Sequence, residues 1–110
     1  MAKYNVSAMV TSGPTDLSLE VNTTEIKMSR DSTGKWAGKA KLDLPETVDV
    51  DFEAEGLPSS PWTLEIKFVT LPPEGKCVKD YKHDDSLPEE GKSEFKETVN
   101  LTAKTGRVAP

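Results

Sequence analysis

The segment VDVDFEAE, residues 48–55, alternates apolar and acidic side chains at every position. A period of two is typical of a β-strand that has one face on the core and the other in water. Four carboxylates therefore project from one face of this strand at intervals of roughly 6.5–7 Å. We call these four the acidic ridge: Asp49, Asp51, Glu53 and Glu55. The ridge indicates either an ordinary solvated sheet face or a surface that meets a basic partner or divalent cations.

The same alternation recurs in six further segments, which are separated by breaks that contain Gly, Pro, Asn or Ser. No window has a helical period, and 8 prolines in 110 residues would interrupt most helices. These features predict an all-β fold, an antiparallel sandwich of seven to eight strands with immunoglobulin-like or fibronectin-like layering. A small barrel is the alternative. The six further segments are residues 4–10, 17–21, 24–28, 36–44, 62–68 and 95–101.

Turn residues predict the register of three hairpins. A two-residue turn at Asn22-Thr23 would pair Val21 with Thr24. A turn at residues 31–34 would pair Met28 with Trp36, and a loop at residues 45–47 would join the next two strands. The register predicts apolar pairs inside and charged pairs outside. The expected pairs are Leu44 with Val48, Leu42 with Val50, Ala40 with Phe52, Lys41 with Asp51, Lys39 with Glu53, and Glu25 with Lys39.

Length and composition predict a single domain over residues 1–110, with residues 103–110 as a frayed tail. A net charge of −5 argues against a nucleic-acid partner, which normally meets a basic patch. One cysteine forms no internal disulfide, and no apolar run approaches the ~18–20 residues of a membrane span. Because the first residues do not resemble a signal peptide, the default expectation is a cytoplasmic protein, unless the chain is an excised module of a secreted or surface protein.

Residues 72–92 are expected to form a long loop, within which residues 76–81 could make a short edge strand with Val78 inward. Tyr81 would be its exposed ring, and Tyr81, His83 and Asp80 are the candidate ligand-binding residues. Asp80, Asp84 and Asp85 are the candidate calcium ligands, although they lack the spacing of a calcium loop. Cys77 and His83 could in principle form a thiolate–imidazolium pair for catalysis. They lie six residues apart in the same segment, however, and no oxyanion hole is evident.

The sequence therefore predicts a protein that is not an enzyme. We expect an interaction or structural module that binds another macromolecule through end loops, at residues 56–61 and 72–92. The expected partner is another protein or a second copy of the chain, since the segment Tyr4–Val10 has few charges to prevent edge pairing. The alternative is a calcium- or carbohydrate-binding surface module that uses the loop at residues 72–92. No cofactor is expected apart from calcium in that alternative.

Overall fold

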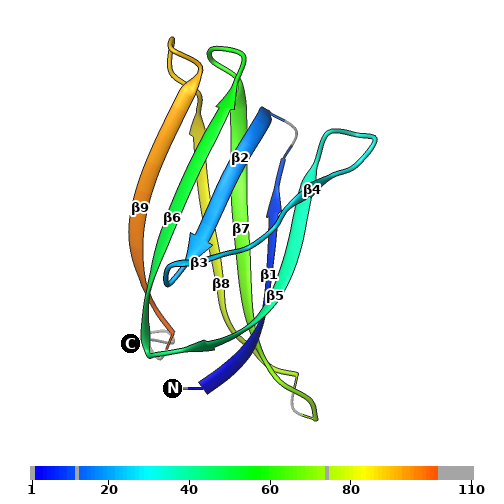
Figure 1. Ribbon diagram of the computed structural model, residues 1–110, viewed down its shortest axis with the longest axis vertical. Coiled ribbons are helices and arrows are strands. Elements are labelled where there is room, and N and C mark those ends of the chain that lie inside the picture. Colours follow the sequence, from blue (N-terminus) through cyan, green and yellow to red (C-terminus); the bar gives the residue numbers. More distant parts are fainter. Residues whose placement is uncertain (1, 12, 74, 102–110) are drawn as a thin grey trace.

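The computed structural model describes residues 2–11, 13–73 and 75–101, and these residues form two antiparallel β-sheets without a helix. The sheets face each other and are not closed into a barrel, so the architecture is that of a sandwich (Figure 1). The predicted all-β, antiparallel sandwich is therefore confirmed, and the small barrel is wrong. The tail predicted at residues 103–110 lies outside the described residues.

The described part of the chain contains seven long strands and two strands of two residues, joined by turns and loops. Sheet A has the strand order β4-β5-β1-β7-β8, and sheet B has the order β3-β2-β6-β9. The bounds are β1 Ala2–Val10, β2 Pro14–Val21, β3 Thr24–Glu25, β4 Ser29–Arg30, β5 Trp36–Leu44, β6 Thr47–Gly56, β7 Pro61–Thr70, β8 Cys77–Ser86 and β9 Lys92–Asn100.

The core lies between the two sheets and contains the inward residues of every long strand. Phe52 of β6 and Phe68 of β7 are 0% exposed, and the Trp62 ring lies 4.9 Å from the Phe52 ring. The Trp and Phe side chains of the strands point inward, although Trp36 and Phe95 are only half-buried because they lie near sheet edges. Alternation along each strand thus places one set of residues in the core and leaves the other set for the surface.

The β2–β3 hairpin has the predicted register, with Val21 opposite Thr24. Asn22 and Thr23 both have positive φ, as a type I′ turn requires. The expected pairing of Met28 with Trp36 is wrong, because Arg30 pairs with Trp36 instead. The turn at residues 31–34 does form, but it closes tightly through a bond from the Asp31 N–H to the Lys35 carbonyl, and this shifts the register by two residues.

The predicted β5–β6 hairpin does not form. The chain leaves sheet A after Leu44 and enters sheet B at Thr47, so β5 pairs with β1 while β6 pairs with β2 and β9. None of the expected lysine–acid pairs across this hairpin exists, and Glu25 lies opposite Glu20 rather than Lys39. Alternation determines which residues of a strand face the core, but both sheets offer the same apolar surface. The pattern therefore cannot tell which sheet a strand joins.

About half of the predicted long loop is a strand. β8 runs over Cys77–Ser86 and pairs with β7, with one register shift beside Phe68 and Val69. It was missed because an edge strand has a neighbour on one side only and tolerates many charged side chains. The short edge strand expected at residues 76–81 is thus the beginning of a strand of ten residues.

The two predicted contact loops only partly share one end of the molecule. Residues 56–61 bond with residues 87–91 through backbone hydrogen bonds, two of which join Leu87 to Ser59 and Ser60. The other described part of the predicted loop, at residues 72–73 and 75–76, lies at the opposite end of β8 (Figure 1). The expectation that β1 offers a pairing edge is also wrong, since β1 lies between β5 and β7 in the middle of sheet A.

Candidate interaction surface

The outer face of sheet B is strongly acidic. Its strands present outward the residues that alternate with the core positions, and the cross-strand registers place them side by side. Among the charged residues of this face, eight are acids and two are lysines, so the face carries a net charge of −6. The rest of the chain has eleven acids and twelve bases. The net charge of the chain therefore resides on one surface. We call it the acidic face: Asp16, Glu20, Glu25, Asp49, Asp51, Glu53, Glu55, Lys92, Glu94 and Lys96.

Acids lie directly opposite acids on this face. Glu20 has Glu25 on one side and Asp51 on the other, and Glu53 lies opposite Glu94. A further acid pair joins β2 to β6 at the other end of the face, between Asp16 and Glu55. Like charges directly opposite each other destabilise a sheet, so the acidic face works against the stability of the fold.

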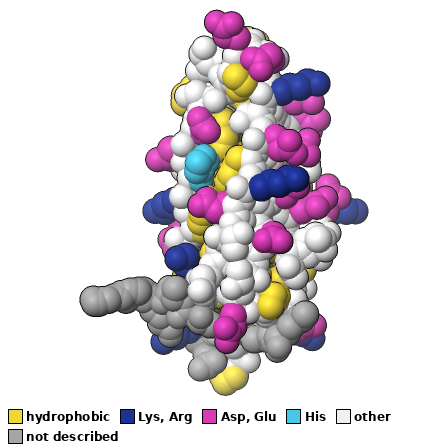
Figure 2. Space-filling view, turned by 90° about the vertical axis from the view of Figure 1, so that its left-hand side faces the viewer, with side chains coloured by type: hydrophobic (Ala, Val, Ile, Leu, Met, Phe, Trp, Pro, Cys, Tyr) yellow, Lys and Arg dark blue, Asp and Glu magenta, His cyan; other side chains and the backbone are white. Residues whose placement is uncertain are grey.

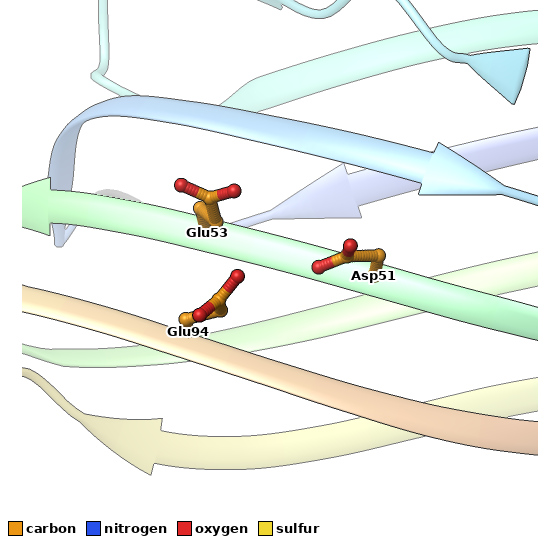
Figure 3. Close-up of side chains that lie close together, drawn as sticks. All are labelled: Asp51, Glu53 and Glu94. Atoms are coloured by element: carbon orange, nitrogen blue, oxygen red, sulfur yellow. The ribbon is translucent and has the colours of Figure 1, made fainter. Parts of the chain in front are cut away.

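The closest acids are Asp51, Glu53 and Glu94, whose carboxylate oxygens lie within 4.8 Å of one another. Figure 3 shows the two side chains of β6 and the one of β9 on the same side of the sheet. The nearest base is Lys96, with its Nζ 4.0 Å from Asp51 Oδ2, while Asp51 Oδ1 is shielded from solvent and accepts no hydrogen bond. A pair this exposed contributes only about 0–1 kcal/mol, so Lys96 offsets little of the repulsion.

Two hollows mark the acidic face. One, of about 460 Å³, lies over β2, β6 and β9 and is bordered by Asp16, Glu53, Glu55 and Glu94. The second, of about 420 Å³, lies further along the same strands, between Glu20 and Lys96. Both are open to solvent and bordered by acidic and lysine side chains, so they could receive long cationic side chains between the acidic rows.

The predicted site residues of β8 lie at the seam where the edges of the two sheets meet. Figure 2 faces this β8–β9 side and shows a narrow line of hydrophobic side chains with acidic side chains around it. The Tyr81 hydroxyl donates a 2.9 Å hydrogen bond to Glu97 Oε2 of β9. The His83 ring stacks on Phe95 of β9 at 4.3 Å, and its Nε2 lies 3.5 Å from Asp85 Oδ2.

Tyr81 is therefore not the exposed ring of a loop. Its ring is half-buried against the core, and its hydroxyl joins sheet A to sheet B. Burial, followed by the hydrogen bond and the charge of Glu97, raises the pKa of the Tyr81 hydroxyl well above its ordinary value of 10.0. At neutral pH it is a hydrogen-bond donor that links the two sheets.

The remaining predicted residues are divided between two faces of β8. Asp80 and Asp84 point outward, with Asp84 Oδ1 accepting a 2.6 Å bond from the Thr63 hydroxyl, whereas Asp85 lies beside His83. The three candidate calcium ligands do not meet as a cluster. Cys77 is exposed at the start of β8, six residues and roughly 20 Å of strand from His83, too far for the two to act as a pair.

Sequence reasoning found the ridge of β6 but missed its neighbours. Glu20 of β2 and Glu94 of β9 complete the acidic face from strands about thirty and forty residues away along the chain. The signal in the sequence is weak, because the two lysines of β9 alternate with Glu94 and give that strand the appearance of a mixed surface. Only the strand order of sheet B brings these acids beside the ridge.

The fold and the surface together define the class of the protein: a two-sheet antiparallel β-sandwich with one acidic sheet face. Comparisons with protein-family models, with curated proteins and with solved structures gave no significant match. The described residues include no helix with the length and hydrophobicity to cross a membrane.

Proposed function

We propose that this protein is a non-enzymatic interaction module that binds a basic protein surface through the acidic face of sheet B. The observation that carries the proposal is the arrangement of acids opposite acids across β2, β6 and β9. Such pairs destabilise an isolated sheet, and lysines or arginines of a partner would relieve the repulsion. The fold would act as a rigid support in the manner of immunoglobulin-like modules, with its two antiparallel sheets holding the charges in fixed rows.

This proposal moves the expected contact from the end loops to a sheet face. The loops at residues 56–61 and 87–91 bond each other through their backbones, and Leu87 is buried between them. Within these loops, Leu57 is the exposed large hydrophobic side chain, at 72%. A single apolar side chain is a smaller recognition feature than eight carboxylates on three strands and one two-residue strand.

A non-enzymatic role is supported by the setting of the carboxylates. Acid–base catalysis by a carboxylate pair needs a raised pKa and a cleft that holds the substrate. Glu53 and Glu94 instead stand exposed on an open sheet face. Long-range attraction of a basic partner requires only the net charge and its position, and both are present here.

The proposal is tested by titrating the isotope-labelled protein with an oligolysine peptide and following the amide NMR signals. Shifts should concentrate on β2, β6 and β9, and the affinity should fall as salt is added. The variant Asp51→Asn/Glu53→Gln/Glu94→Gln should bind roughly tenfold more weakly, a loss of about 1.4 kcal/mol. The matched control neutralises three acids on the outer face of sheet A, Glu65→Gln/Asp80→Asn/Asp84→Asn, and should bind as the unaltered protein does.

Equal weakening by the two triple variants would contradict the proposal, because it would show that the peptide responds to total charge and not to the acidic face. Shifts confined to residues 56–61 and 87–91 would return the contact to the end loops. Circular dichroism of both variants checks that neither result reflects unfolding.

A further inference from the structure

The edge of β5 away from β1 is largely unpaired. Among residues 2–11, 13–73 and 75–101, the strand beside this edge is β4, which pairs with Trp36 and Ala37 only. Figure 1 shows β5 continuing past β4 along the margin of sheet A. Gly38 is packed closely against residues 26–28, so residues 39–44 present the free edge, and a free edge with unpaired N–H and C=O groups is a template for another strand.

The hydrogen bonds of the β4–β5 turn show which residues face this edge. The Lys35 carbonyl accepts a bond from Asp31 on the β4 side. Because backbone groups of successive strand residues point to alternate sides, the N–H and C=O groups of Lys39, Lys41 and Asp43 point away from β1. Those of Ala40 and Leu42 point toward β1, so edge pairing would use only the odd-numbered residues.

We propose that a second copy of this chain pairs antiparallel with this edge, about a two-fold axis that passes through Leu42. In this register Lys41 of each copy lies opposite Asp43 of the other, which gives two pairs of opposite charge on the outer face. On the inner face Leu42 meets Leu42, and Ala40 meets Leu44. The contact is isologous, and it would join the two five-stranded sheets into one sheet of ten strands.

Neighbouring registers are less favourable. A two-fold axis through Lys41 places the two Lys41 side chains opposite each other, and an axis through Asp43 does the same for the two aspartates. An axis through Ala40 pairs Lys39 with Lys41. Like charges directly opposite each other destabilise strand pairing, so charge selects the axis through Leu42.

The other long edges are less suited to a second copy. On β8, Lys82 lies 3.7 Å from Glu65 and Asp84 bonds to Thr63, so both of these side chains have partners within the chain, whereas on β5 only Asp43 has one among the described residues, Lys3 at 4.0 Å. On β2, pairing about Ser18 would place Asp16 opposite Glu20. For Lys39 and Lys41 on β5, the described residues provide no ion-pair partner.

A two-fold axis between antiparallel strands of one sheet is perpendicular to that sheet, because outward residues pair with outward residues. The two acidic faces would therefore point in the same direction. If the acidic face binds a basic partner, as proposed above, the dimer is a bivalent form of the same surface. Dimerisation itself does not depend on that function and is measured without any partner.

Light scattering on a size-exclusion column, over a series of protein concentrations, tests the pairing. The unaltered protein should show a dimer that dissociates on dilution. Lys41→Pro should be monomeric, because it removes an N–H that points to the free edge and leaves the pairing with β1 intact. Lys41→Asp should weaken the dimer roughly tenfold, and the double variant Lys41→Asp/Asp43→Lys should restore it, because the charges are exchanged across the same pairs.

Crosslinking tests the register. In a Cys77→Ser background, Leu42→Cys should form a disulfide-linked dimer under mild oxidation, because the axis brings the two cysteines opposite each other. The matched control, Ala40→Cys, lies on the same face of β5, but its copies would be separated by about 13 Å along the strand, and it should remain uncrosslinked. A protein that is monomeric at all concentrations, a Lys41→Pro variant that folds and still dimerises, or equal crosslinking at the two positions would overturn the proposal.

Discussion

The outer faces of the two sheets have the same construction but different net charge. Sheet A presents five lysines and four acids, and opposite charges pair there: Lys3 lies 4.0 Å from Asp43, and Lys82 lies 3.7 Å from Glu65. Sheet B presents eight acids and two lysines. Acids lie opposite acids in four pairs, and the two lysines lie opposite Glu55 and Asp51. The charged residues of the sheet A face are Lys3, Lys39, Lys41, Lys67, Lys82, Asp43, Glu65, Asp80 and Asp84.

This difference separates what the fold requires from what it merely tolerates. A solvated sheet face needs polar side chains of mixed sign, and sheet A meets that need with a net charge of +1. Sheet B departs from the mixture at a cost in stability, on strands that pack against the same core. The core does not account for the departure, and the proposed binding of a basic partner would account for it.

The first prediction, with the largest effect, is that the two sheets contribute equally to the core although their outer faces differ in charge. Phe52→Ala in β6 and Phe68→Ala in β7 each remove a ring that is 0% exposed, and each should lower the free energy of unfolding by about 3–5 kcal/mol. Urea unfolding followed by tryptophan fluorescence measures both. Leu57→Ala is the control and should change the free energy by less than about 0.5 kcal/mol, since its side chain is 72% exposed.

A loss limited to one of the two phenylalanine variants would contradict this expectation. It would mean that one sheet holds the core together while the other is only loosely attached. The difference between the acidic face and the face of sheet A would then reflect unequal packing as well as charge.

The sequence predicted the positions of the strands better than it predicted which strands pair with each other. The alternation in β6 was sufficient to place Val50 and Phe52 in the core and Asp51 and Glu53 in water, because the period of a strand is a local property. The hairpin at Asn22-Thr23 was also predictable, since its turn chemistry lies within four residues. The assignment of β5 and β6 to different sheets was not, because it depends on the contacts of β5 with β1 over distant parts of the chain.

The candidate surface was predictable only in part, for the same reason. The acidic ridge is visible in eight consecutive residues, but Glu20 and Glu94 join it only through the order β2-β6-β9. Tyr81 and His83 were singled out as loop residues because charged neighbours concealed the alternation of β8. Their packing at the seam with Phe95 and Glu97 is a property of the two sheets together, and the segment alone does not contain it.

The second prediction is that the same charge reversal has opposite effects on the two faces. Glu53→Lys should stabilise the protein by about 0.2–1 kcal/mol, because the new lysine lies opposite Glu94 and relieves an acid pair. Glu65→Lys should destabilise it by a similar amount, because the new lysine lies opposite Lys82, whose amine Glu65 now attracts at 3.7 Å. Urea unfolding at low ionic strength measures both effects.

Repeating the second experiment in high salt supplies its control. Both effects should decrease, since screening acts on exposed charges of either sign. Stabilisation by both variants would indicate that the protein responds only to its net charge of −5 and not to the arrangement of charges on each face.

The third prediction concerns two acids with opposite contributions to stability, and its effect is the smallest. Asp31, in the turn between β4 and β5, accepts bonds through Oδ1 from the Thr33 hydroxyl at 2.6 Å, the Thr33 N–H at 2.8 Å and the Lys35 N–H at 3.1 Å. The bond from the Thr33 hydroxyl, followed by that from the Thr33 N–H, lowers the pKa of Asp31 below its ordinary value of 3.8. A lowered pKa means that ionised Asp31 stabilises the fold above pH 3.8 and that this contribution is lost as the pH falls through the folded-state value.

Asp31→Asn retains an acceptor oxygen but cannot ionise, so the variant should be slightly less stable than the unaltered protein at neutral pH, and the difference should shrink below pH 3.8. Glu53→Gln on the acidic face should show the reverse sign, because removing one charge of the Glu53–Glu94 pair relieves repulsion while both are ionised. Thermal unfolding of the three proteins from neutral to strongly acid pH tests this pair of signs. If both variants are destabilised at neutral pH, the acids of sheet B support the fold as Asp31 does, and the repulsion inferred from their placement is wrong.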